Sequence, residues 1–314
     1  MYLNPRRALQ EVSTHEAHYH NILYHHFQDF IALETDRYRL LKSLLDEFEI
    51  SYLVITIAGN RHFFVSPEPA SGGFLGFPLG GQTAIILVAH YDRVPGSPGA
   101  NDNSAAVFEL IEAALKLREE QVRSWLIIFT DKEEILQGEG IRDQGSYTLA
   151  MGLRDAGFGG AQVFIFDACG TGDTLIISKT ADHLMKYETG PGITRTRHLV
   201  QQLRTRALET ARHLDMDRVL LVPTPFSDDA GFFRAGIAAQ TITMLPAEEA
   251  AALGSLLRTK PDIADALFCR EVPNEALVLP KTWRCLNSPE DSYLRLTPQY
   301  FPIVVRFACA LCGG

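Results

Sequence analysis

The sequence lacks any long apolar run. No stretch approaches the roughly 20 apolar residues of a membrane-spanning helix, and the N-terminal MYLNPRRALQEVSTHEAHYH has no apolar segment typical of a signal peptide. Cysteine is scarce and odd in number, at five, and no second C-x-x-C accompanies Cys309 and Cys312. These absences predict a cytoplasmic protein with reduced thiols, no membrane association and no four-cysteine zinc site.

Positive charge is also in short supply. Lys and Arg together number 29 against 38 Asp and Glu, which gives a formal net charge of −9. Nucleic-acid binding needs a basic surface, so this balance argues against nucleic acid as the main partner, whereas clustered carboxylates can hold a cation. Internal repeats and low-complexity linkers are absent as well, and a length of 314 residues with 46% hydrophobic composition allows a large core. The oligomeric state is not fixed by any of these features.

Histidine is abundant near the N-terminus, at positions 15, 18, 20, 25 and 26. These side chains could suggest a metal site, but the segment EVSTHEAHYHNILYHHFQDFIAL is typical of a helix and gives them no fixed ligand geometry, so we favour partly exposed helix histidines. Thr35 and Asp36 then mark the start of another helix through RYRLLKSLLDEF. We expect residues 1–34 to form a helical extension and residues 35–314 a single domain.

Strand-like and helix-like segments alternate along that domain. LVITI and HFFV predict a hairpin around Gly59 and Asn60. Continuous apolar runs follow, namely AIILVAH, WLIIFT, QVFIFD, TLIIS, RVLLV and AQTITM, and helices are expected at 103–117, 194–213 and 298–311. Runs that are apolar on both faces suit a central sheet covered by helices, so the predicted fold is α/β with a mostly parallel or mixed sheet. Ligands bind beyond the carboxyl ends of the strands in such sheets.

Acidic and imidazole side chains gather at those predicted strand ends. AIILVAH ends in His90, WLIIFT leads to Glu133 and Glu134, QVFIFD ends in Asp167, and Asp102 lies in a loop before a helix. Each has a simple alternative role, as a helix cap, a solvated loop acid, a turn residue or a core histidine. Together at one sheet edge they would repel one another unless a cation neutralised them. Mixed imidazole and carboxylate ligands suit zinc, with manganese or cobalt as alternatives.

The order of these motifs resembles that of the co-catalytic dizinc aminopeptidases, a family that also includes glutamate carboxypeptidase-like proteins and single-zinc glutaminyl cyclases. ILVAHYDRVPGSPGANDNSAAVFELIEAA is similar to the family's most specific signature, PFSDDAGFFRAGIAAQTITM to its Ser-Asp segment, and LNSPEDS to its last motif. The resemblance runs in order over roughly residues 35 to 311. It implies a zinc-exopeptidase-like fold and a peptide or aminoacyl small-molecule substrate.

The resemblance also implies a role for each motif residue. His90 and Asp167 would bind one metal, Asp102 would bridge two metals, and Glu134 would bind the second. Glu133 would be the general acid or base, and Asp92 would orient His90. Asp228 would help to shape the substrate side, although a role as a loop cap is an equally good interpretation.

One expected ligand departs from the family pattern. The last motif normally supplies a histidine to the second metal, and Asn287 stands there; Asp229 likewise stands where the family often has histidine. Because an amide oxygen is a weak zinc ligand, we expect one tight site and a second, held by Asp102, Glu134 and Asn287, that is weak or empty. His183 or His198 could instead fold back to complete it.

Two segments are longer than the family pattern. ILQGEGIRDQGSY follows Glu134 and is either a lid or a surface insertion, and the segment from Met244 to Asn287, with Phe268 and Trp283, could roof the pocket. The leading hypothesis is an aminopeptidase that cleaves the N-terminal peptide bond with a metal-activated water. The alternatives are a non-hydrolytic metal- or ligand-binding protein of the same fold and a different amide hydrolase or acyltransferase.

Overall fold

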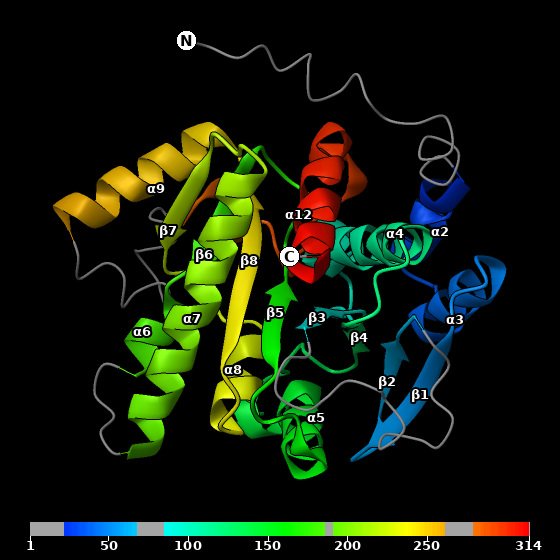
Figure 1. Cartoon of the computed structure of the whole chain (residues 1–314). Helices are drawn as coiled ribbons and strands as arrows, with labels where there is room; N and C mark the ends of the chain where they lie inside the picture. Colours follow the sequence, from blue (N-terminus) through cyan, green and yellow to red (C-terminus); the bar gives the residue numbers. More distant parts are fainter. Residues whose placement is uncertain (1–21, 68–84, 186–190, 261–278, 314) are drawn as a thin grey trace.

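A mixed β-sheet forms the centre of the molecule (Figure 1). The structure is a computed structural model that describes residues 22–67, 85–185, 191–260 and 279–313. Within these ranges the sheet has eight strands in the order β1-β2-β4-β3-β5-β8-β6-β7. The strands are β1 (Tyr52–Ile57), β2 (Asn60–Val65), β3 (Ile85–His90), β4 (Trp125–Thr130), β5 (Gln162–Phe166), β6 (Thr174–Ser178), β7 (Val219–Val222) and β8 (Ala239–Leu245). The predicted α/β class with a mixed sheet is confirmed.

The middle of the sheet is parallel. Strand β3 pairs in parallel with β4 and with β5, and β5 pairs in parallel with β8, whereas β1, β2 and β6 make the antiparallel pairings. The predicted hairpin is present, with Ile57 opposite Asn60. Its two turn residues, Ala58 and Gly59, have φ values of 50° and 87°, as a tight hairpin turn that matches the strand twist requires.

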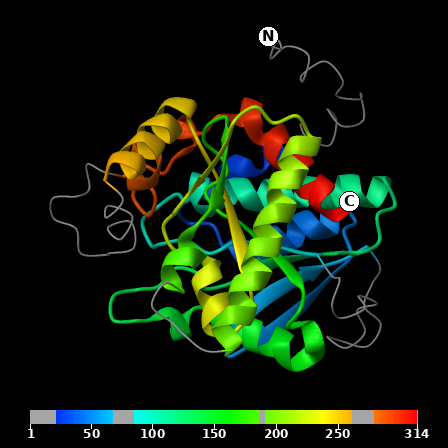
Figure 2. The same ribbon diagram turned by 60° about the vertical axis from the view of Figure 1, so that its left-hand side comes forward.

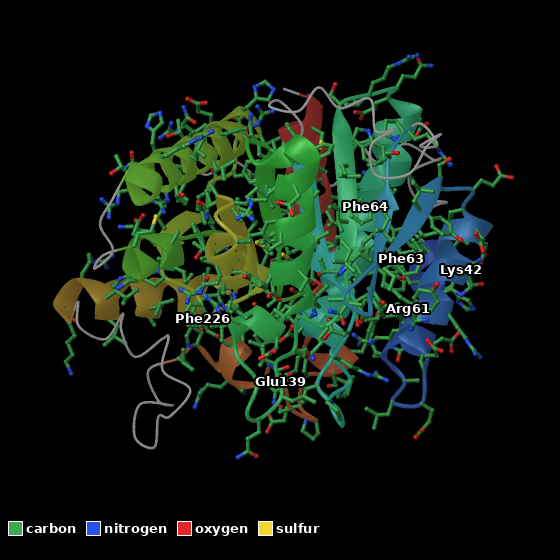
Figure 3. All side chains as sticks on the ribbon, turned by 90° about the horizontal axis from the view of Figure 1, so that it is seen from below. Lys42, Arg61, Phe63, Phe64, Glu139 and Phe226 are labelled. Atoms are coloured by element: carbon green, nitrogen blue, oxygen red, sulfur yellow. The ribbon has the colours of Figure 1, made fainter. Side chains whose placement is uncertain are left out.

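Helices cover both faces of the sheet, as the alternating side chains of its strands predict. Phe63, on β2, packs into a core with α2 (Phe27–Ile31), α3 (Arg37–Glu47), α4 (Ala105–Glu119), α7 (Pro191–His213) and α12 (Phe301–Gly313). Phe64, its neighbour in the chain, belongs to a second core with α5 (Gly145–Leu153) and α8 (Asp228–Arg234); both phenylalanines are labelled in Figure 3. Figure 2 shows α7 crossing in front of β8. A third, smaller core joins Ile176 to α9 (Ala247–Thr259) and to Trp283 of α11 (Lys281–Arg284).

The predicted helices are present with shifted boundaries. Asp36 caps α3 by accepting a hydrogen bond from the Arg39 amide, as expected. Helix α4 begins at Ala105 rather than at Asn103, because Asp102 and Asn103 have non-helical backbone angles. Helix α12 begins at Phe301, after a short 3-10 turn over Pro298–Tyr300.

The C-x-x-C pair lies on α12, where Cys312 is buried and Cys309 is partly buried. Neither thiol forms a disulfide in the described part of the chain, and both side chains pack against the larger core. The interpretation of this pair as core residues is therefore confirmed.

The N-terminal histidines fall partly outside the described residues, which exclude His15, His18 and His20. His25 is exposed, and His26 Nε2 lies 3.4 Å from Glu47 Oε2. The proposed division between an extension and a domain at residue 34 stays a prediction. In the part of the chain that the structure describes, no helix combines the length and apolarity needed to cross a membrane.

Candidate metal centre

The candidate site lies at the carboxyl ends of the central parallel strands. His90 is the last residue of β3, Glu133 and Glu134 follow β4, and Asp167 follows β5. Because β3 pairs with both neighbours in parallel, these ends meet at one edge of the sheet. Asp102 reaches the same place from the turn before α4.

One group of ligand atoms surrounds a common point. His90 Nε2 lies 3.1 Å from Asp102 Oδ1 and 3.7 Å from Asp167 Oδ1, and the three ligand atoms lie within 4.8 Å of one another. Ligands at about 2.0 Å from a tetrahedral zinc stand about 3.3 Å apart. The His90 ring is completely buried, and neither nitrogen makes a hydrogen bond of acceptable geometry with the described residues. This donor set therefore fits a zinc ion, and His90, Asp102 and Asp167 are the residues that would hold it.

Asp92 connects the histidine to the neighbouring strand end. Its Oδ1 lies 3.3 Å from His90 Nδ1, and its two oxygens accept hydrogen bonds from the backbone amides of Glu133 and Glu134, each at 3.0 Å. Burial alone would raise the pKa of Asp92, but the His90 ring and these two amides lower it. A single carboxylate thus lies against the ligand ring and fixes the loop that carries both glutamates, and its role in orienting His90 stays a prediction.

Two buried side chains hold the turn that presents Asp102. The Arg37 guanidinium donates to Ser104 Oγ and to four backbone carbonyls, those of Tyr91, Asp92, Pro98 and Gly99. The Asp291 carboxylate accepts from the amides of Asn101 and Asp102, at 2.8 and 3.0 Å. Arg37 and Asp291 therefore fix the same turn, although they lie more than 200 positions apart in the sequence.

The two glutamates occupy a strongly electronegative environment. Burial and the surrounding carboxylates raise the pKa of Glu134 to about 9 and that of Glu133 well above its usual value. Burial likewise raises the pKa of Asp102, with Asp167 adding to the effect. Crowded buried carboxylates of this kind call for a neutralising cation.

Asn287 faces Glu134. With its amide nitrogen turned toward Glu134, it donates to both carboxylate oxygens, at 2.7 and 3.2 Å. If the amide oxygen of Asn287 faces Glu134 instead, only hydrogen-bond acceptors point at one another there. A cation or a proton between them would then be needed. The structure thus brings Asn287 to the position that the last motif predicts, and its role as a ligand stays a prediction.

Asp228 lies at the start of α8, completely buried, and accepts a hydrogen bond from Thr130 Oγ1 at 2.7 Å. Burial raises its pKa to about 6, and burial raises that of the adjacent Asp229 to about 7. The backbone amide of Ser227 donates to Asp229 Oδ1. The negative charge of the candidate ligand Asp167 contributes to the raised pKa of both aspartates.

A pocket of about 200 Å³ opens beside the cluster. Asp102, Glu133 and Asp167 contribute to its lining. The lining also includes the apolar residues Phe226, Leu279, Trp283 and Leu286, together with Asn287 and with Thr241 and Thr243 of β8. Trp283 thus contributes to the pocket, as predicted for the segment before Asn287, whereas Phe268 falls outside the described residues.

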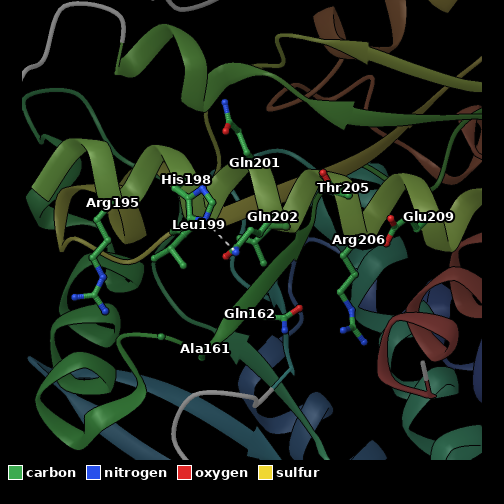
Figure 4. Close-up of a pocket in the computed structure, with 13 residues that line it drawn as sticks. Ala161, Gln162, Arg195, His198, Leu199, Gln201, Gln202, Thr205, Arg206 and Glu209 are labelled. Carbon is green, nitrogen blue, oxygen red and sulfur yellow. Dashed lines mark hydrogen bonds between the residues drawn. The ribbon is translucent and has the colours of Figure 1, made fainter. Parts of the chain in front are cut away.

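The histidines suggested as replacement ligands lie elsewhere. His198 lines a separate groove of about 710 Å³ along α7, and its Nε2 lies 3.1 Å from Gln202 Nε2 (Figure 4). His183 lines a third hollow, between α6 (Thr180–Leu184), β7 and α9. The idea that either one completes the metal site is therefore wrong for this structure, because α7 and α6 direct them to other surfaces.

Several residues of the site were not predicted from the sequence. These residues are Arg37, Asp291 and Gln144, which form hydrogen bonds to the backbone or to other residues of the site. Side chains that bind backbone groups have no characteristic sequence motif, so the sequence did not indicate them. Thr241 and Thr243 left a weak signal, because they are the polar members of one face of the β8 run AQTITM. The alternation of Thr with Ile242 and Met244 indicates that this face of the strand meets something other than apolar core.

Comparison with solved structures places the fold among zinc-exopeptidase-like proteins. A zinc aminopeptidase from Bacillus subtilis is 19% identical with a TM-score of 0.50, over 80% of this chain and 48% of that one. The LapA aminopeptidase of Legionella pneumophila is 14% identical with a TM-score of 0.60, over 92% and 70%. A glutaminyl cyclase from Porphyromonas gingivalis is 16% identical with a TM-score of 0.59, over 92% and 96%. The chain thus spans about half of the length of the Bacillus enzyme.

The class that this fold and cluster define is that of the metal-dependent peptidases and their relatives. The profile of peptidase family M28 matches residues 77–252, more than half of the 314 residues, and the chain belongs to this family. Comparison with curated protein sequences found no match. The predicted family is therefore confirmed.

Proposed function

We propose that this protein is a metal-dependent aminopeptidase that hydrolyses the N-terminal peptide bond of peptides or small aminoacyl compounds. The observation that carries the proposal is the pairing of a ligand group, His90, Asp102 and Asp167, with a buried carboxylate, Glu133, that this group does not need. Glu133 also lies with His90 and Glu134 in a second group of possible ligand atoms, and we infer that it stays free of the metal, because a buried carboxylate beside a metal site is suited to proton transfer.

Zinc is the ion that the donor set fits best, with manganese or cobalt as substitutes. When bound, the ion would polarise the scissile carbonyl and lower the pKa of water. The tight site is assigned to His90, Asp102 and Asp167. The second site, with Asp102, Glu134 and Asn287, has an amide where a stronger ligand is usual, and we assign it low affinity.

Glu133 carries the proton in this scheme. The hydroxide part of water adds to the scissile carbonyl carbon, and the released proton passes to the Glu133 carboxylate. The same proton then moves to the amine that leaves when the carbon–nitrogen bond breaks, which restores the carboxylate. Asp92 supports this step by fixing the Glu133 amide.

The charge of the pocket favours an N-terminal residue over a C-terminal one. Its lining includes Asp102, Glu133 and Asp167, and no lysine or arginine is found among the described lining residues. Because the metal would neutralise Asp102 and Asp167, Glu133 is the lining acid left to attract a free α-ammonium group, whereas a free α-carboxylate would find no lysine or arginine in the described lining. Asp228, the buried aspartate at the start of α8, lies outside the described lining but directly follows Ser227, which belongs to it, and we assign it to shaping the substrate side from behind.

The test combines metal analysis with a panel of aminoacyl amides and p-nitroanilides. We expect turnover with zinc, manganese or cobalt, and we expect Glu133→Gln to lower kcat by about 10²- to 10⁴-fold while the metal content stays the same. Glu248→Gln, at an exposed position on α9, is the matched control and should leave kcat unchanged.

Retained turnover in Glu133→Gln would contradict the assignment of the proton carrier. An absence of turnover with every metal, together with normal metal binding, would favour the non-hydrolytic binding protein suggested by Asn287. Release of ammonia from N-terminal glutamine, without peptide cleavage, would identify a cyclase instead.

A further inference from the structure

We propose that Gln144 is a positioning residue that fixes the Glu133 carboxylate for proton transfer, an inference that rests on the proposed function. Gln144 is 2% exposed. It does not belong to the described lining of the pocket and so lies behind Glu133 rather than beside a substrate. Its effect on the reaction would therefore pass through Glu133 alone.

One amide group holds both ends of Glu133. Gln144 Nε2 donates to the Glu133 backbone carbonyl at 3.1 Å and to Glu133 Oε1 at 2.9 Å. These two bonds use both amide hydrogens and link the main chain and the carboxylate of the same residue. The rotation of the glutamate side chain is thereby restricted to conformations that keep both distances.

The close contact between α5 and the end of β4 brings Gln144 to this place. Gly145, the first residue of α5, donates its amide to the Lys132 carbonyl at 2.8 Å. A Cβ atom at position 145 would lie 1.9 Å from the Asp131 carbonyl oxygen, so only glycine allows this approach. Gln144 is the N-cap of the same helix and is therefore held next to Glu133 by backbone contacts.

The arrangement distinguishes the two carboxylate oxygens. Oε1 already accepts a hydrogen bond from Gln144, whereas Oε2 has no such bond to it. Oε2 is thus the oxygen assigned to receive and return the proton. The loop between Glu134 and Gly145 was predicted to be a lid or an insertion. Its last residue is Gln144, which supports the site.

The test uses the metal-loaded, full-length chain and two substitutions. Gln144→Met keeps the length of the side chain without its donors, and Gln144→Glu keeps its shape but replaces the amide nitrogen by oxygen. We expect both to lower kcat by about 10- to 100-fold with little change in KM and in metal content, since a small misplacement of a reacting group has effects of this size. Met151→Leu, a volume-conserving change on the same helix at a side chain that packs against the second core, should leave kcat unchanged.

The decisive comparison is made in the Glu133→Gln background. If Gln144 acts through Glu133, Gln144→Met causes no further loss of kcat there, whereas a merely structural role predicts the same loss in both backgrounds. Wild-type kcat in both Gln144 variants would overturn the inference while leaving the aminopeptidase proposal intact. An inactive wild-type enzyme would overturn the proposed function, and this inference with it.

Discussion

At the scale of single residues, Asn287 is the position that we propose limits the number of metals at the site. Its amide meets Glu134 at 2.7 Å, where a histidine would offer a much stronger nitrogen ligand. We predict that Asn287→His raises the bound metal from about one ion per chain to about two, because the imidazole completes the ligand set of Asp102 and Glu134.

Metal stoichiometry after equilibration with limiting zinc checks this prediction. Ser255→His, which adds a histidine at an exposed position on α9 with no other histidine three or four residues away, is the matched control and should bind no additional ion. An unchanged stoichiometry in Asn287→His would show that position 287 does not serve the second site.

His62 is a buried histidine that gives the stability a definite pH dependence. It is completely buried on β2, and its Nδ1 accepts a hydrogen bond from the Asp131 amide at 3.3 Å. Burial lowers its pKa from 6.5 to about 4, which corresponds to about 3 kcal/mol. Between pH 6.5 and 4 the folded state keeps this ring neutral, whereas the unfolded state protonates it. The stability that depends on the neutral His62 ring is therefore fully present above pH 6.5 and is lost as the pH falls from 6.5 to 4.

The comparison of the wild type with His62→Asn isolates this contribution, because an asparagine oxygen can accept the same amide hydrogen bond. We predict that the free energy of unfolding of the wild type falls more steeply than that of the variant between pH 6.5 and 4, as measured by urea denaturation in one metal state. Parallel pH profiles for the two proteins would contradict the prediction.

At the scale of secondary-structure elements, the contact of α5 with the end of β4 depends on one glycine. A side chain at position 145 would overlap the Asp131 carbonyl oxygen, at 1.9 Å from Cβ. We predict that Gly145→Ala lowers the free energy of unfolding by about 3 kcal/mol and also lowers kcat, since it displaces the residue next to Glu133.

Gly152→Ala, on the same helix, is the control for this prediction. Its Cβ would make an ordinary contact with Ile57 at 3.4 Å, and alanine favours the helical backbone by up to ~1 kcal/mol relative to glycine. Chemical denaturation should therefore show unchanged or higher stability for Gly152→Ala. Equal stability of the two variants would show that the space at residue 145 is not limiting.

Element order explains how much of the site could be predicted. His90 ends one apolar run and Asp167 follows another, and both runs suit central strands, whose parallel pairing brings their ends together. Gln144 and Asp291 lie in irregular segments, where neither hydrophobic periodicity nor strand pairing defines a position. Their contacts depend on where α5 and the last motif dock, and this docking is a property of the packed molecule rather than of the local sequence.

At the scale of the whole molecule, the metal is expected to contribute to folding stability. The carboxylates at the strand ends repel one another when no cation neutralises them, and burial adds to this cost. We predict that removing the metal with a chelator lowers the free energy of unfolding by about 4 kcal/mol relative to protein at a free zinc concentration near 1000 times Kd. Equal melting temperatures with and without chelator would contradict a metal site in the folded state.

The contact between Asp291 and the turn at Asn101 and Asp102 has a consequence for biosynthesis. A nascent chain exposes His90, Asp102 and Asp167 long before residue 291 leaves the ribosome, so during most of translation Arg37 holds the turn at Asp102 without the second anchor, Asp291. Stable metallation should then be a post-translational event, and stalled chains that end before residue 291 should exchange zinc rapidly with the surrounding pool.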